Sequence, residues 1–532
     1  MKTKSYSALS LLGLLCISGL GFSTPLDDYI ALPDPNFTWT EVDSVYDGDF
    51  WTNTTATNLK VTSQLWRTPN EVDTTEWTHW VTVIEPGGFA ITLAGGVHDT
   101  ALILINGGDI GESAPIIDPA DPNHAQFRNL ALGTRSVIVE LRGVPNQPLV
   151  FADDPNARSE DEIIAYSWDK FLNGGDDEWL VQLPMVKSVV ACMDAVQQFD
   201  DTVSGMTIND FVLTGGSKRG WTAWLTAAVD NRVTAIAPIV SDLLNMPRSF
   251  AHHWSCYGFW ADALAPYEEM NIFDWFDTPR ADELVAIVDP YAYRDRLTIP
   301  KLIITAAGDD FFVHDSIQFY FDDLLGETYV RTVPNTNHYL DGAFDTVFEN
   351  MVPYYDAFLR GQARPDFSWV LEDDGSMTVI ATDTPLAVNL WQADNPTVRD
   401  FRQVTIGTAW TSTPLTEDPP GSGVYIAAPG VPATGWRSYF VELVYDFSGA
   451  IADEINAFDY HFTTEMRVLP EMRPYETDWT RDGLTDLADV SVLSVYWLSE
   501  TPYYDIMPRR TGDGVINLGE MSIFSLHWLG VN

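Results

Sequence analysis

Short apolar runs alternate with stretches of helical spacing over residues 101–361. The apolar runs are typical of buried strands; they are residues 101–105, 136–141, 211–214, 233–240, 301–305 and 329–333. The helical stretches between them are residues 185–199, 218–229 and 315–324. This alternation predicts an α/β fold with a mostly parallel sheet and helices on both faces.

The pattern changes on both sides of this region. Residues 80–84 and 89–93 have the spacing of β-strands, which predicts an N-terminal β segment. From residue 364 to residue 470, alternating runs such as 377–381, 424–428 and 438–445 are separated by Gly, Pro and Asp, which predicts a β-sandwich-like extension. We therefore expect an α/β-hydrolase domain at 24–363, the extension at 364–470, and a small α-helical module at 476–532 that contains an internal duplication.

The first 23 residues have the pattern of an export signal. Lys2 and Lys4 precede an apolar stretch over residues 8–20, which is too short for a stable membrane span, and small residues lead up to Ser23. No later stretch is apolar for long enough to cross a membrane. We expect the mature protein to be secreted, periplasmic or associated with the cell surface, without membrane insertion.

Charge and cysteine content narrow the function classes. With 29 Lys and Arg against 76 Asp and Glu, the formal net charge is −47, which disfavours nucleic acid and anionic membranes as partners. The apolar fraction of 45% supports a large core and excludes a mainly disordered chain. After signal cleavage only Cys192 and Cys256 remain; one disulfide is possible, but the helical setting of Cys192 favours a buried free thiol.

The most informative segment for chemistry is residues 211–220, in which a buried strand meets a helix at Gly215-Gly216-Ser217. A sharp strand-to-helix turn of this kind exposes a serine hydroxyl above the sheet, and its glycines relieve crowding. The common pattern is Gly-x-Ser-x-Gly, and this chain departs from it because Arg219 takes the second position after the serine and Gly220 the third. A plain glycine-rich turn is the alternative interpretation.

A serine nucleophile needs a base, and the base needs an acid to orient it. In a parallel α/β hydrolase the acid and the histidine follow later strands, where the chain has Asp309 or Asp310 and then His338. We favour Asp309 as the acid and leave Asp310 as its alternative. The competing histidines either precede the acid or follow it too closely; they are His252, His253 and His314.

Stabilisation of an oxyanion needs two donors. The backbone N–H of Lys218 follows the nucleophile, and a backbone N–H of Gly107 or Gly108 would supply the second donor after an earlier strand. The Lys218 ammonium either approaches the oxyanion or lies on the surface. The acidic runs at 160–162 and 176–178 would either anchor the amino group of a peptide substrate or lie solvated on the surface.

Seven segments together resemble the family of PhoPQ-activated pathogenicity-related proteins. They are LDDYIALPDP (26–35), VPNQPL (144–149), RSEDEIIA (158–165), PMVK (184–187), GSKRGW (216–221), GDDFF (308–312) and VPNTNH (333–338). The resemblance spans residues 25–445 and implies an α/β-hydrolase that cleaves an ester or a peptide bond. The turn at 215–220 alone is similar to the Gly-x-Ser-Arg-x-Gly turn of glucuronoyl esterases, in which the basic residue is thought to help hold the oxyanion.

The C-terminal duplication has the spacing of a calcium loop. Positions 1, 3, 5, 9 and 12 of residues 478–489 carry oxygen ligands, position 7 offers a carbonyl and position 6 is Gly483; the ligands are Asp478, Thr480, Asp482, Leu484, Asp486 and Asp489. The second copy has Arg509 at position 1, so we expect it to bind calcium weakly or not at all. The pair resembles a type I dockerin, which implies structural calcium and a cohesin-like receptor; a calcium-stabilised structural tail is the alternative.

The function predicted from these features is a secreted serine hydrolase with a Ser217, His338 and Asp309 triad and no cofactor for catalysis. A small molecule, a sugar ester or a peptide would be the substrate, and the dockerin-like module would tether the enzyme. One alternative is a glucuronoyl or acetyl esterase acting in polysaccharide degradation. The other is a non-catalytic secreted binding or signalling protein on a retired hydrolase fold.

Overall fold

A computed structural model describes residues 23–205, 207–447, 458–481, 484–498 and 515–527. The helices are α1 Pro25–Ala31, α2 Phe89–Leu93, α3 Pro122–Thr134, α4 Asp161–Leu172, α5 Gln182–Phe199, α6 Lys218–Val229, α7 Met246–Tyr257, α8 Ala265–Glu269, α9 Pro279–Val288, α10 Phe344–Leu359, α11 Gln403–Ile406, α12 Leu487–Tyr496 and α13 Leu518–His527. The predicted signal at 1–22 lies outside the described residues. Within them, no helix is long and apolar enough to cross a membrane.

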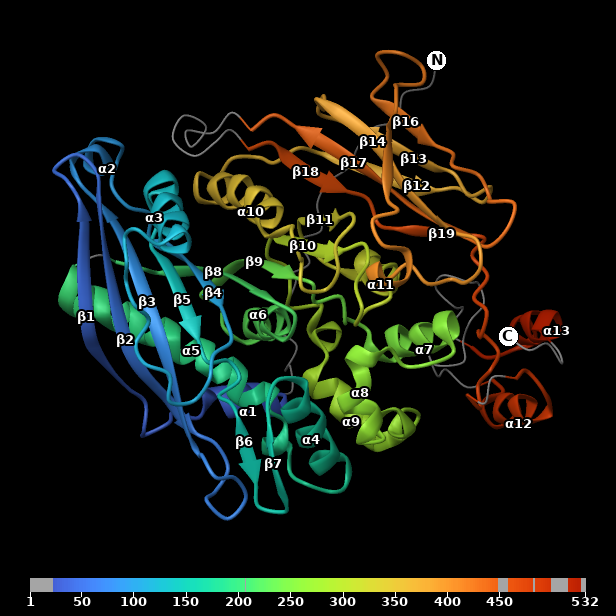
Figure 1. Ribbon diagram of the computed structural model, residues 1–532, viewed down its shortest axis with the longest axis horizontal. Coiled ribbons are helices and arrows are strands. Elements are labelled where there is room, and N and C mark those ends of the chain that lie inside the picture. The colour runs from blue at the N-terminus through green and yellow to red at the C-terminus, as the bar shows by residue number, and fades with distance from the viewer. Residues whose placement is uncertain (1–22, 206, 448–457, 482–483, 499–514, 528–532) are drawn as a thin grey trace, which may run out of the picture.

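A twisted sheet runs through the whole molecule (Figure 1). Its central strands are β2 Asn53–Leu65, β3 Glu76–Gly87, β4 Thr100–Ile105, β5 Ile138–Arg142, β8 Asp210–Gly216, β9 Val233–Ile239, β10 Lys301–Ala306 and β11 Thr328–Val333. They lie in the order β2-β3-β5-β4-β8-β9-β10-β11, with β5 to β11 parallel and β3 antiparallel to β5. This is the strand order of an α/β-hydrolase, so the mostly parallel sheet expected from the sequence is confirmed.

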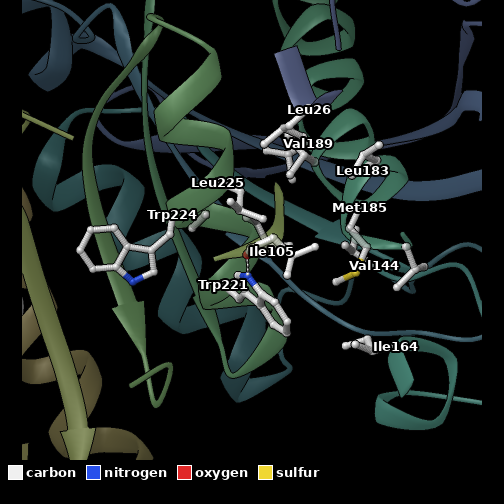
Figure 2. Packing of buried hydrophobic residues seen from close by; sticks show 14 of the residues in the cluster. Leu26, Ile105, Val144, Ile164, Leu183, Met185, Val189, Trp221, Trp224 and Leu225 are labelled. Atoms are coloured by element: carbon white, nitrogen blue, oxygen red, sulfur yellow. Dashed lines mark hydrogen bonds between the residues drawn. The ribbon is translucent and has the colours of Figure 1, made fainter. Parts of the chain in front are cut away.

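Side chains alternate between the two faces along each central strand, as the pleat requires. In β4, Ile103 packs with α5 and α6 on one face, whereas Leu102 packs with α3 and α10 on the other. Figure 2 shows the first face, where Trp221 and Leu225 of α6 lie near Ile105 at the end of β4. Helices therefore cover both faces of the sheet, which explains why these strands are apolar at almost every position.

The extension continues the hydrolase sheet instead of forming a separate unit. Strand β18 Tyr460–Thr463 pairs with the last central strand at Val330 and Thr463, and the sheet goes on through further strands. These are β17 Trp436–Tyr445, β14 Ala387–Asn395 and β15 Thr411–Pro414, with β19 Arg467–Leu469 beside β17. At the other edge, β1 Thr38–Gly48 pairs with β2.

A second β layer covers part of this extended sheet. It consists of β12 Phe367–Leu371, β13 Met377–Ala381 and β16 Val424–Ala427. Met377 and Val379 share one apolar cluster with Tyr439 and Val441 of β17, and the Tyr439 hydroxyl donates to the Gly375 carbonyl over 3.0 Å. The extension is thus two-layered, as predicted, but no break in the sheet marks its start. A separate two-stranded sheet, β6 Leu149–Phe151 and β7 Asp154–Arg158, lies near α4.

Two predicted elements were wrong. Residues 89–93 form the short helix α2, because Gly88 at φ 101° turns the chain out of β3 directly before them. Residues 315–324 form two 3₁₀ turns instead of an α-helix, and the buried ion pairs of Asp315 hold the start of this segment. Cys192 is a buried free thiol as expected, and Cys256 is likewise free and buried.

Candidate active site

Ser217 lies on a sharp turn between β8 and α6. Its φ of 56° and ψ of −124° fall in a backbone region that non-glycine residues rarely occupy. Gly220 allows the close crossing, because a Cβ there would lie 2.8 Å from the Gly215 carbonyl oxygen and 2.9 Å from the Ser241 Cβ. The crowded position is therefore the third after the serine, which explains why Gly220 and not residue 219 is the glycine.

Arg219 fastens this turn to the start of α4. Its guanidinium donates to both Glu160 carboxylate oxygens over 2.6 and 2.7 Å and to the Val144 carbonyl over 2.6 Å. Glu160 has the same unusual backbone conformation as Ser217, with φ 55° and ψ −127°. Two strained turns are thus held face to face by a bidentate ion pair, a geometry that Arg supplies and Lys does not.

The Lys218 side chain is buried and completes a balanced cluster of charges. Its ammonium lies 2.8 Å from Glu160 and 2.9 Å from Asp161. Burial by itself would raise the pKa of Glu160, but the hydrogen bonds and charges of Arg219 and Lys218 lower it to about 2. With Gln147 also donating over 2.7 Å, both Glu160 oxygens are fully engaged, so this carboxylate is not free to anchor an amine.

The acidic run at 176–178 lies away from the turn that carries Ser217. Asp176 is an exposed partner of Arg67 at 2.6 Å and does not line the cleft that contains Ser217. Of the two acidic runs in the sequence, only residues 160–162 are next to the turn that carries Ser217.

The structure brings His338 and Asp309 into direct contact. His338 Nδ1 lies 2.8 Å from Asp309 Oδ2, and Asp309 Oδ1 accepts the backbone N–H groups of Phe311 and Phe312 over 2.7 and 3.0 Å. An ionised carboxylate only accepts hydrogen bonds, so the imidazole proton resides on Nδ1 and Nε2 presents its lone pair. Nε2 is buried and has no hydrogen-bond partner within the described part of the chain.

Asp310 does not reach the histidine ring by any hydrogen bond. Burial and the charge of Asp309 raise the pKa of Asp310, and its Oδ1 lacks a partner among the residues described. The three histidines that compete in the sequence are engaged elsewhere: His252 with Asp315, His314 with Ser438 and His253 with the Ala261 amide.

A cleft of about 660 Å³ contains both Ser217 and His338. No hydrogen bond joins the Ser217 hydroxyl to His338 in the structure; catalytic hydrogen bonds often close only when substrate binds. Sequence reasoning missed the rest of the cleft lining because its residues come from separate strands, loops and helices; they include Asn123, Gln126, Phe127, Glu140, Arg142, Tyr339, Leu340 and Val347.

The predicted second oxyanion donor is not supported by the geometry. The Gly107 N–H donates to the Asn106 side chain over 2.9 Å, and Gly108 lines a different hollow beside Lys60 and His79. The Gly143 N–H bonds the Gly107 carbonyl over 3.1 Å, which ties this turn to the residue after β5. Only the Lys218 N–H, at the start of α6, remains from the predicted pair.

Asp242 is a further acid near this site that sequence reasoning did not find. It follows β9, is fully buried and accepts the Tyr320 hydroxyl over 2.7 Å. Burial first, and then the charges of Asp309 and Asp315, raise the pKa of Asp242 to about 8. The available signal was its position three residues after the end of an apolar strand.

A family model described as "PhoPQ-activated pathogenicity-related protein" matches residues 26–402. The chain belongs to this family. A relative of known name, "Autocrine proliferation repressor protein A" from Dictyostelium discoideum, is 36% identical over 491 residues, which are 88% of this chain and 95% of that protein.

Solved structures with some similarity to this PhoPQ-related chain include two esterases. Acetyl xylan esterase 1 from Thermoanaerobacterium sp. JW/SL YS485 is 16% identical, with a TM-score of 0.35, and covers 61% of this chain and 90% of its own. The rice cell wall degrading esterase LipA from Xanthomonas oryzae is 10% identical, with a TM-score of 0.36, and covers 61% of this chain and 98% of its own.

The C-terminal module follows the PhoPQ-related region and contacts α7. The Trp254 indole donates to Asp478 over 3.4 Å, and both Asp489 oxygens accept hydrogen bonds from the loop itself, from Thr480 and the Asp486 amide. Asp482 and most of the second loop lie outside the described residues. Within those that are described, no three acidic, His or Cys side chains gather to hold a metal.

Proposed function

We propose that this PhoPQ-related protein is a serine hydrolase. In the first step the Ser217 oxygen attacks the acyl carbon while His338 Nε2 takes the hydroxyl proton. The imidazolium then gives this proton to the leaving group, and an acyl-enzyme remains. A water molecule, activated by the same nitrogen, releases the acid and restores the serine. Asp309 stays ionised and stabilises the imidazolium throughout.

One observation carries the proposal. A buried imidazole is oriented by a carboxylate on one side and has an unpaired nitrogen on the other, in the same cleft as a serine on a strained strand-to-helix turn. Unpaired buried nitrogens are costly in a structural histidine, whereas a general base requires one.

Lys218 would stabilise the oxyanion. Its N–H stands at the start of α6, where the helix dipole favours negative charge. Its ammonium has three protons, of which Glu160 and Asp161 take two, so one is left for the substrate. The buried position of this side chain argues against a surface lysine.

Fluorophosphonate labelling, read by intact mass, tests the nucleophile. The mature protein should take one adduct, and Ser217→Ala should take none. A folded protein without an adduct would favour the second candidate, a non-catalytic binding or signalling protein. The relative that is named as a proliferation repressor gives that candidate its support.

Among hydrolase substrates, the engaged state of Glu160 favours esters over the free amino end of a peptide. A sugar ester in a polysaccharide setting fits this preference. Rates on dipeptidyl anilides against acetyl and uronate sugar esters would separate the two classes.

We also propose that the protein is exported, that its C-terminal module binds calcium, and that this module tethers the enzyme. Intact mass of protein recovered from the medium should show loss of residues 1–23. Calcium titration of the full chain should reveal about one strong site, which Asp478→Ala should weaken. Cohesin-like binding would then be measured with calcium and with a chelator; a structural tail would bind calcium without a receptor.

A further inference from the structure

A second, smaller cavity opens beside Ser217. It measures about 40 Å³, and Ser217 and Lys218 line both this cavity and the wide cleft. Its other walls are mainly aromatic and aliphatic; they include Trp168, Trp221, Leu243, Met246, Phe250 and Phe312. The nucleophile therefore stands between two spaces of very different size.

The position of His338 decides which part of a substrate enters each space. His338 lines the wide cleft and does not line the small cavity. In acyl transfer the histidine must hand its proton to the leaving group, so the leaving group has to lie on the side of His338. The acyl group then points the other way, past Ser217 and toward the small cavity.

We propose that the small cavity is an acyl pocket that accepts short, apolar acyl groups of the acetyl to propionyl size, while the wide cleft takes a large polar alcohol. The inference rests on the proposed serine hydrolase function and specifies its substrate class. The bond that breaks joins the acyl carbon to the alcohol oxygen, which leaves with the proton from His338.

The size of the cavity sets the limit on the acyl chain. A group the size of a water molecule needs about 10–15 Å³ of cavity volume, so a cavity of about 40 Å³ holds roughly three such groups. Acetyl and propionyl chains fit, whereas an octanoyl chain does not. Trp168, Leu264 and Met246 are almost fully buried, and close packing around them resists widening.

The polarity of the cavity excludes a peptidyl group. The aromatic donors in its wall are already engaged: the Trp221 indole with the Val288 carbonyl, the Trp168 indole with Gln182 and the Tyr267 hydroxyl with Asp161. The Lys218 ammonium in the same wall is held by Glu160 and Asp161, and its third proton serves the oxyanion. A peptidyl group would bring a further amide unit, for which the cavity has neither room nor a remaining donor. Burying that amide unpaired is unfavourable.

A chain-length series on the full-length protein tests the acyl pocket. We would measure kcat/KM for p-nitrophenyl acetate, propionate, butyrate and octanoate, each divided by its rate with hydroxide. Acetate and propionate should exceed octanoate by roughly tenfold or more, the scale on which a fixed apolar pocket discriminates methylene groups.

A matched pair of variants locates the effect. Leu243→Ala enlarges the cavity and should raise the octanoate-to-acetate ratio by about tenfold. Leu244→Ala removes an equally buried neighbour that does not line the cavity, so it should leave the ratio unchanged even if it lowers Tm.

Two results would overturn the inference in distinguishable ways. If wild-type protein takes the fluorophosphonate adduct but hydrolyses octanoate or dipeptidyl anilides as fast as acetate, the acyl pocket is refuted and the serine hydrolase stands. If no adduct forms and no ester is cleaved by a folded protein, both proposals fail together.

Discussion

Replacement of Asp309 by asparagine should abolish most of the activity while the protein stays folded. In the structure Asp309 Oδ1 accepts the amides of Phe311 and Phe312, and His338 Nδ1 lies 2.8 Å from Oδ2 and 3.0 Å from Oδ1. An asparagine oxygen can keep the two amide bonds, which leaves its NH₂ group facing Nδ1. A donor at that point favours the tautomer with its proton on Nε2, which then has no lone pair for the serine proton.

The expected loss follows from this tautomer change. For Asp309→Asn we predict that kcat falls by about 10⁴-fold, equivalent to about 5 kcal/mol of transition-state stabilisation, the scale of the loss when a serine hydrolase loses its acid in this way. The assay is p-nitrophenyl acetate hydrolysis, with Tm measured in parallel to show that the protein is folded.

Asp310→Asn is the matched control. This neighbour makes no hydrogen bond to His338, so the activity of Asp310→Asn should stay within a few-fold of wild type. If Asp309→Asn kept its activity and Asp310→Asn lost it, the assignment of the acid, and the reasoning from ring orientation, would be wrong.

Three further predictions concern the surroundings of the site. Glu160→Ala leaves Arg219 without its carboxylate partner and leaves Lys218 with Asp161 alone. Because the Glu160 side chain is 39% exposed, we expect a loss of about 1–3 kcal/mol in urea unfolding, with Glu162→Ala as a near-neutral control. The pKa of Asp242 is raised to about 8, so the folded state retains a proton that the unfolded state releases near pH 3.8. Stability should therefore fall as the pH rises from about 4 to 8. Asp242→Asn should flatten this decrease in a plot of Tm against pH. Gly220→Ala should lower the free energy of unfolding by about 1–3 kcal/mol in thermal unfolding, because its Cβ would lie 2.8 Å from a backbone oxygen. Gly216→Ala should be tolerated, because nothing lies within 4 Å of a Cβ at that position. Equal losses of stability in the two variants would contradict the packing argument.

The local pattern of the sequence was sufficient for the central elements. The helix predicted at 218–229 has the observed limits, and six predicted strands form the parallel part of the sheet. Such elements are readable because apolar periodicity and glycine positions act over a few residues. The order of serine, acid and histidine along the chain also follows from strand succession.

Contacts between distant segments were decided only by the tertiary structure. Arg219 meets Glu160 across 59 residues, and the extension joins the hydrolase sheet where Val330 pairs with Thr463. The turn after β4 looked like an oxyanion loop, but in the structure the Gly107 N–H bonds the Asn106 side chain and Gly108 lines a separate hollow.

The physical reason is that local patterning fixes the type of an element but not its neighbours. A strand with free edge groups can pair with any partner that satisfies them, and a buried charge settles where the whole fold places its counterion. The sequence by itself therefore determined the candidate catalytic residues and the strands that present them. The tertiary structure decided the charge cluster behind the serine, and the sizes of the two spaces between which that serine stands.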